Sequence, residues 1–366
     1  MKKYALNDIT LMQFIFMIHG AQLGVGVFTL PADLAKVAGT DGWISLFIGW
    51  AITLIVSVVI IQIMKHHPED TLYDLLPKYF GKWLGLLLNL LVVGYFLLAF
   101  FSSTIASLSV VKQTLLPKTP NYLLAFVVCI PIYTIARNHL RVIARYAELI
   151  FWGCLWLLPL FLYALRESVW LNLLPLIKEG WMPILKGGKA TSLSFQGFET
   201  LFMLYPFLKN KKDAIKGVFI ANTLTLSMYV MAVVVCFLYF PPDGITNYNW
   251  PPLRLLKTIE FRFLERFEVI WIVGYLFILS RVWIFTLYYA SLGSSRIFGK
   301  QDHRPFVRIF ILGLLLASFF YAPGYSKGKM FQEWSGNAGI VFAFLFPWFL
   351  WLYTTVIRRL RKGTTI

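Results

Sequence analysis

The chain has 366 residues, of which 58% are hydrophobic, 17% aromatic and only 14% charged, and its mean hydropathy is +0.69. Soluble domains average about 25% charged residues, so this composition excludes an ordinary soluble domain and indicates a polytopic membrane protein. The net charge of +17 could suggest nucleic-acid binding, but Lys and Arg gather in alternate loops between apolar segments, which is the pattern of membrane topology. We therefore expect a lipid bilayer as the environment and no nucleic acid as a partner.

Ten apolar segments approach the ~20 residues that an α-helix needs to span a bilayer. They lie at about 10–31, 43–64, 83–108, 121–136, 147–166, 191–208, 216–240, 268–292, 306–322 and 338–357. Ten spans place both termini on one side, and the loops on that side carry most of the Lys and Arg, so both termini are predicted to be cytoplasmic. The predicted fold class is all-α and integral to the membrane, with residues 1–366 as a single transmembrane domain.

Two connecting segments have helical patterns of their own. The outer connection 241–267 mixes Leu, Ile and Phe with charged residues, which fits either an amphipathic helix at the membrane interface or an extended start to the eighth span. The inner segment 65–81 resembles a short interfacial helix.

The first apolar segment contains an unusual cluster of glycines. Gly20, Gly24 and Gly26 fall within seven residues, and Pro31 follows. In a helix interior Gly costs about 1 kcal/mol relative to Ala, and Pro about 3. We interpret the segment as a membrane helix interrupted at 20–26, where backbone groups freed from the helix would line a solute cavity. The same glycines could instead form a seam of close helix packing, since Gly20 and Gly24 have small-xxx-small spacing.

The sixth segment repeats this design. It is only weakly hydrophobic, and its polar centre around Gly197 is followed by aromatic residues, Leu and then Pro206. Five spans separate the two interruptions, and an odd number of spans per repeat forces the two halves into opposite orientations. The sequence therefore predicts a 5+5 inverted repeat, with repeat one at about 8–166 and repeat two at about 190–358.

These motifs carry a family resemblance. LGVGVFTLP at 23–31, TDGW at 40–43, GKW at 81–83, GYF at 94–96 and SFQGFETLF at 194–202 resemble the amino acid–polyamine–organocation permease superfamily. They resemble more closely the B-subunits of spore germinant receptors, the spore permease family. The resemblance implies a leucine-transporter-like fold with broken helices 1 and 6. It also implies sensing of a small germinant, usually an amino acid, in the spore inner membrane, together with separate A- and C-type subunits.

Glu199 and Arg281 are the two best-placed charges inside the predicted spans, where charges are costly and mark functional sites. Arg281 could bind a ligand carboxylate with its guanidinium fork, or it could pair with Glu199 and join the sixth span to the eighth. His19 could couple the site to protons, or it could be a neutral histidine that is hydrogen-bonded inside the bundle.

The predicted ligand site lies between the first, third, sixth and eighth spans. Backbone groups at the two breaks and the amides of two glutamines supply its polar contacts, and the resemblance adds pocket walls from the third and eighth spans. The predicted ligand-binding residues are His19, Ala21, Gln22, Gly24, Gly26, Tyr95, Ala99, Phe195, Gln196, Gly197, Glu199, Arg281, Val282 and Phe285.

Three functions fit these features. The first is a germinant-binding receptor subunit that signals to partner subunits, and the alternative is a proton-coupled amino-acid secondary transporter with the same pocket. The third is a scaffold that only organises its complex. The segment GSSRIFGK at 293–300 departs from the phosphate-binding P-loop in its spacing, and the histidines have no metal-ligand spacing. We therefore expect no enzymatic step, cofactor or metal.

Overall fold

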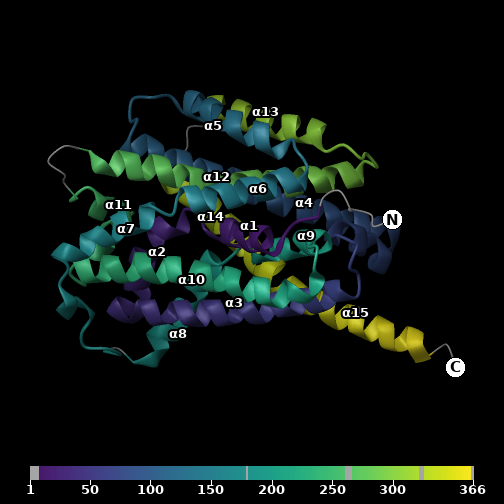
Figure 1. Cartoon of the computed structure of the whole chain (residues 1–366), viewed down its shortest axis with the longest axis horizontal. Coiled ribbons are helices and arrows are strands. Elements are labelled where there is room, and N and C mark those ends of the chain that lie inside the picture. The colour runs from purple at the N-terminus through teal and green to yellow at the C-terminus, as the bar shows by residue number, and fades with distance from the viewer. Residues whose placement is uncertain (1–7, 179, 260–265, 321–324, 364–366) are drawn as a thin grey trace.

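The computed structural model describes residues 8–178, 180–259, 266–320 and 325–363, and it shows a bundle of helices that lie roughly along one axis (Figure 1). Among these described residues no strand forms, and the only bridge between extended segments joins Ile9 to Leu208 in parallel. The all-α prediction is therefore confirmed. The α-helices are α1 (Leu11–Gln22), α2 (Gly26–Ala38), α3 (Gly42–Lys65), α4 (Leu72–Thr114), α5 (Asn121–Ala136), α6 (Leu140–Gly153), α7 (Leu157–Leu162), α8 (Trp181–Ser194), α9 (Leu201–Leu204), α10 (Ala214–Tyr239), α11 (Pro251–Leu256), α12 (Phe267–Ile297), α13 (Arg304–Phe320), α14 (Tyr325–Gly339) and α15 (Phe346–Gly363).

The first helix is interrupted, but over a shorter stretch than the predicted 20–26. Helix α1 ends at Gln22 and α2 begins at Gly26, so the break comprises residues 23–25. Gly20 lies inside α1, and its bare Cα faces a neighbouring side chain, since an added Cβ would lie 3.0 Å from Cδ of Arg281. The absence of a side chain at Gly20 therefore makes room for this arginine.

The second interruption follows α8. After Ser194 the chain leaves the α-helix, and it continues through short turns at Phe198–Thr200 and Tyr205–Phe207 on either side of α9. The predicted start of this segment at residue 191 was wrong, because α8 already begins at Trp181. Hydropathy missed residues 181–190 because they include two glycines, two lysines and a proline.

The span count measured on the helices is lower than ten. Within the described residues, five continuous helical runs are long and apolar enough to cross a membrane, or six if α6 and the segment after it, bent by 40°, count as one span. The first break leaves α1 too short for this test and places α2 in one run with α3, Gly26–Lys65, while the second break leaves only short pieces of the predicted sixth span. The predicted tenth span starts too late at 338, because the helical run begins at Tyr325 and passes through a π-helical turn at Ile340–Leu345 into α15. The count of ten spans therefore stays a prediction.

The two connecting segments behave differently from each other. Helix α4 begins at Leu72 and is kinked at Gly81, where φ is 78°, so the residues before the kink form a short helix of their own. Leu72, Leu75 and Leu76 are fully buried, so this short helix packs into the bundle rather than lying on its surface. In the outer connection the structure places the short helix α11, but residues 260–265 of the predicted amphipathic helix lie outside the described residues.

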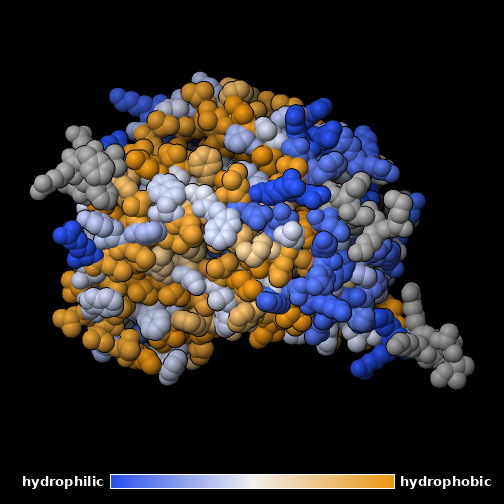
Figure 2. Space-filling view, in the orientation of Figure 1, coloured by the Kyte–Doolittle hydropathy of each residue, from blue (hydrophilic) through white to orange (hydrophobic). Residues whose placement is uncertain are grey.

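Hydrophobic side chains cover most of the visible face of the bundle, and hydrophilic side chains gather at the end where both termini lie (Figure 2). Large apolar side chains are strongly exposed at many positions, such as Trp83 at 81% and Phe320 at 89%. A soluble monomer rarely exposes apolar surface on this scale, so the surface is that of a membrane protein with its basic loops at one end.

Helix α8 is held in place by a seam of small residues on α3. The Ser45 hydroxyl donates to the Ile184 carbonyl at 2.7 Å, and the Thr191 hydroxyl lies 3.0 Å from the Ser45 carbonyl. Gly49 lies so close to α8 that an added Cβ would be 2.5 Å from Oγ1 of Thr191 and 3.1 Å from a backbone nitrogen. Small residues allow such close helix approach in membranes, and this seam positions the second break.

Replacing Gly49 with alanine should therefore destabilise the protein by about 1–3 kcal/mol through overpacking. The matched control is Gly94→Ala, because a Cβ at Gly94 has no atom within 4 Å and alanine favours the helix. Thermal unfolding of both purified variants in the same detergent measures the effect. Equal melting temperatures for G49A and G94A would contradict the close packing of α8 against Gly49 on α3.

Candidate functional site

The two helix interruptions are in direct contact at Gly197. This glycine has φ of 120°, and an added Cβ would lie 2.5 Å from the carbonyl carbon and oxygen of Ala21 and 2.7 Å from the nitrogen of Gln22. The second break therefore packs on the peptide bond at the end of α1. Only glycine satisfies both the backbone conformation and this approach, which explains the unusual composition of the sixth segment.

Gln22 joins the same two breaks through its side chain. Its Nε2 donates to the Phe195 carbonyl at 3.1 Å and to Oδ1 of Asn222 at 2.6 Å. Its Oε1 accepts from the Thr225 hydroxyl at 2.8 Å. All four side chains are buried, so one glutamine connects α1, the second break and α10 with a satisfied polar network.

Tyrosine hydroxyls donate hydrogen bonds to further backbone carbonyls at the breaks. The Tyr229 hydroxyl lies 2.8 Å from the carbonyls of both Gln22 and Ser194, and the Tyr275 hydroxyl donates to the Gly24 carbonyl at 3.0 Å. Backbone groups inside a membrane protein need partners, and here the protein itself provides them. Whether these carbonyls also face a solute stays a prediction.

Glu199 is the acidic group at the second break. It is only 3% exposed, and it accepts hydrogen bonds from the Tyr95 hydroxyl at 2.7 Å and from the Gly197 backbone N–H at 2.7 Å. Tyr95 thereby connects α4 to the second break, as the predicted position of the third span requires. In the part of the chain that the structure describes, no cation forms an ion pair with Glu199.

Arg281 does not pair with Glu199, so that alternative is not realised in this structure. It lies near the middle of α12 and is 1% exposed. Its Nε donates to the Ile278 carbonyl at 3.3 Å, while Nη1 is buried without a hydrogen-bond partner. The two oxygens of Glu199 each accept a hydrogen bond from a neutral donor, Tyr95 and the Gly197 N–H, instead of from Arg281.

His19 occupies a hydrogen-bonded position inside the bundle. Its Nδ1 lies 2.9 Å from the Thr225 hydroxyl, and its ring packs edge-on against Phe151 with centroids 5.7 Å apart. Thr225 has acceptors of its own in Gln22 and in the Ala221 carbonyl. The hydroxyl oxygen is therefore free to accept the proton of Nδ1, so His19 is hydrogen-bonded inside the bundle.

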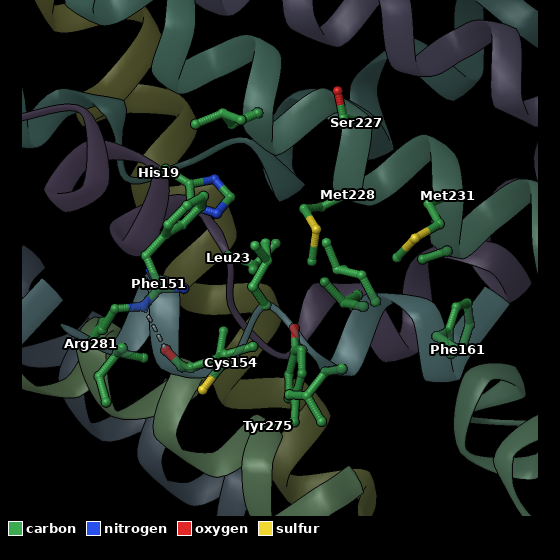
Figure 3. Close-up of a pocket in the computed structure, with 18 of the residues that line it drawn as sticks. His19, Leu23, Phe151, Cys154, Phe161, Ser227, Met228, Met231, Tyr275 and Arg281 are labelled. Carbon is green, nitrogen blue, oxygen red and sulfur yellow. Dashed lines mark hydrogen bonds between the residues drawn. The ribbon is translucent and has the colours of Figure 1, made fainter. Parts of the chain in front are cut away.

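A cavity of about 150 Å³ lies beside the first break, between α1, α6, α7, α10 and α12 (Figure 3). Arg281 and His19 lie toward one end of the view, and Phe161 and Met231 lie at the other. Of the predicted ligand-binding residues, this cavity includes His19 and Arg281. It adjoins the predicted fifth and seventh spans rather than the third and sixth, so it differs from the expected location.

Several other predicted residues have structural partners. Gln196 donates to the Gly336 carbonyl at 2.9 Å and so fixes the second break to α14. Phe285 is 1% exposed within the core, and the Ala99 carbonyl accepts from Ser103 within α4. Val282, like Ala99, lies in a helix that flanks the breaks and is partly buried.

Sequence reasoning missed the polar face of α10. Asn222, Thr225 and Tyr229 bind the two breaks, yet they sit in a segment that otherwise has the composition of an ordinary apolar span. Their spacing of three and four residues places them on one helical face. A stripe of hydrogen-bonding side chains along one face of a membrane helix was the available signal.

Two interrupted helices that touch inside a helical membrane bundle, with a cavity beside them, define a protein with a transporter fold. The chain superposes on a Na⁺-coupled sialic acid symporter in a substrate-bound, outward-open state with a TM-score of 0.62 at 13% identity, covering 94% of this chain and 79% of that one. It superposes on Mhp1, a nucleobase-cation-symport-1 family transporter, with a TM-score of 0.57 at 12% identity, covering 93% and 78%. These likenesses show the fold.

The chain belongs to the spore germination protein family, whose model matches residues 8–325. It is 33% identical to spore germination protein YndE of Bacillus subtilis over 301 residues, which is 81% of this chain and 82% of the relative. It is 30% identical to spore germination protein GerQB of Bacillus cereus over 352 residues, covering 95% and 96%. The resemblance read from the motifs is therefore confirmed.

The contact between the breaks makes a sharp mutational prediction. Gly197→Ala should cost at least about 2 kcal/mol, because alanine is strained at this φ and its Cβ overlaps a peptide bond. Gly24→Ala should be tolerated, because a Cβ there has no atom within 4 Å. Melting temperatures of the purified variants distinguish the two, and a G197A protein as stable as G24A would refute the contact.

Proposed function

We propose that this chain is the germinant-binding subunit of a spore germination receptor. It binds a small nutrient, an amino acid in the first instance, inside the membrane and signals to A- and C-type partner subunits. The observation that carries this proposal is the contact of Gly197 with the Ala21–Gln22 peptide. A solute bound beside this contact interacts with both interrupted helices, so it favours one arrangement of the two halves.

The proposed topology has ten spans in one transmembrane domain, arranged as inverted repeats at about 8–166 and 190–358. Both termini face the spore core, and the bilayer is the spore inner membrane. The hydrophilic end of the bundle, where the termini lie (Figure 2), and the excess of Lys and Arg in the loops predicted on that side support this orientation. The parallel bridge from Ile9 to Leu208 supports the repeat, because it joins the start of the first broken segment to the end of the second.

One observation favours the alternative of a proton-coupled amino-acid transporter. Glu199 is a buried carboxyl group at the second break, and its hydrogen bonds come from neutral donors. A carboxyl group in such a site is a candidate for binding and releasing a proton during transport. The same residue in a receptor would only position Tyr95 and the break.

Spores in which this chain is disrupted should lose germination in response to one nutrient and keep their response to the others. The loss should be restored by the wild-type chain. Germination is followed by the fall in optical density of a spore suspension after each nutrient is added. An unchanged response to every nutrient tested on wild-type spores would contradict the receptor proposal.

Glu199→Gln separates the receptor from the transporter. The glutamine keeps the fold, because its oxygen accepts from Gly197 and its nitrogen donates to the Tyr95 oxygen, while the ionisable group is removed. For a receptor we expect the nutrient response to persist within about threefold. Reconstituted protein that takes up the amino acid along a proton gradient, and loses this uptake in E199Q, would instead establish the transporter.

A further inference from the structure

Arg281 lines the cavity beside the first break, and its guanidinium has hydrogen-bonding capacity that the protein does not satisfy. Nη1 of Arg281 is buried without a partner. The other donors with fixed roles along the cavity wall are used within the protein. They are the Tyr275 hydroxyl to Gly24, Trp271 Nε1 to Leu157, the Ser227 hydroxyl to Thr223, and the Cys154 thiol to Gly274.

The remainder of the wall is apolar. It is made mainly of Leu, Ile, Val, Phe and Met side chains from α1, α2, α6, α7, α10 and α12. An apolar protein cavity of about 150 Å³ holds a molecule the size of benzene. The measured volume therefore suits a tail of about six carbon atoms.

The positive charge of Arg281 also favours one class of ligand over another. A buried cation without a counter-ion is costly, and a carboxylate offsets that cost through charge-assisted hydrogen bonds to the guanidinium. Among the described residues that line the cavity none is Asp or Glu, so an ammonium group would have no anionic partner. It would also lie in the same small cavity as the Arg281 cation.

We propose that this cavity binds a small monocarboxylate with an apolar tail, its carboxylate on Arg281 and its tail toward Phe161 and Met231. The site prefers such an acid to the zwitterionic amino acid with the same tail. Leu155 is 41% exposed and Ser227 is also exposed where they line the cavity, so the cavity opens to the surface of the bundle at these two residues. The inference goes beyond the proposed function, because neither Gly197 nor the Ala21–Gln22 peptide, beside which the amino acid is proposed to bind, lines this cavity. It rests on that function only in that the chain binds a small solute.

The first test compares three ligands of similar shape on the purified full chain: 4-methylpentanoate, its neutral amide, and L-leucine. Isothermal titration and ligand-dependent melting report binding. We expect saturable binding of the acid, and binding of the amide and L-leucine weaker by at least about tenfold. Binding of the amide as tight as that of the acid would overturn the proposal, as would stabilisation by chloride alone at the same concentration.

Variants then locate the site. Arg281→Gln should weaken binding of 4-methylpentanoate by at least about 30-fold, the loss expected when one partner of a buried charge pair is removed. Because R281Q could also affect folding, Ala232→Leu provides an independent variant: Ala232 lines the cavity and is 2% exposed. Leucine there should weaken 4-methylpentanoate at least about tenfold more than propanoate, and equal effects on the two acids would place the ligand elsewhere.

The inference and the proposed function can fail separately. Arg281-dependent binding of the acid to purified protein tests the inference, whereas a lost nutrient response in disrupted spores tests the proposed function. Spores carrying R281Q could respond normally to a nutrient that requires this chain, while the purified wild-type protein fails to bind the acid. That pair of results would support the proposed function and contradict the carboxylate site.

Discussion

The packing of Gly197 on the Ala21–Gln22 peptide is the constraint on which the rest of the site depends. Two helices that stop inside a membrane leave carbonyl and N–H groups without helical partners. Bringing the two ends into contact lets a few side chains serve both at once. Gln22 binds the Phe195 carbonyl, and Tyr229 lies within hydrogen-bond distance of a carbonyl on each break. The arrangement is possible only because one residue at the contact has no side chain.

This constraint explains the surrounding polar residues. Asn222 and Thr225 on α10 complete the hydrogen bonds of Gln22, and Glu199 accepts the Gly197 N–H while it holds Tyr95 on α4. Each of these groups is buried, so losing any one would leave another unsatisfied in a medium where that is costly. The two breaks are therefore joined by hydrogen bonds within the protein at Gln22, Ser194, Phe195 and Gly197.

Much of the architecture could be predicted from the sequence because it depends on local composition. Apolar segments, basic loops and the glycine clusters around Gly24 and Gly197 were enough to predict a helical membrane protein with two interrupted helices. The bounds of the second interruption could not be predicted from hydropathy, because α8 is held by close packing of small residues such as Gly49 rather than by apolar side chains.

The partners of individual polar residues could not be predicted, because they depend on which helices meet. Glu199 and Arg281 are the two best-placed charges inside the predicted spans, so pairing them was a natural hypothesis. In the structure Glu199 has neutral donors, whereas Arg281 lies against the bare Cα of Gly20 and lines a cavity. Gly20 thus has a different role from Gly197: one makes room for a guanidinium, and the other for a peptide bond.

The two charged residues have different surroundings. The junction at Gly197 is held by hydrogen bonds between protein groups. The cavity a short distance along α1 is different, because Nη1 of Arg281 lacks a partner and the cavity wall belongs to α1, α10 and α12 together. Arg281 on α12 also packs against the bare Cα of Gly20 in α1, so the side chain that lines the cavity contacts the same interrupted helix that meets the second break at Gly197.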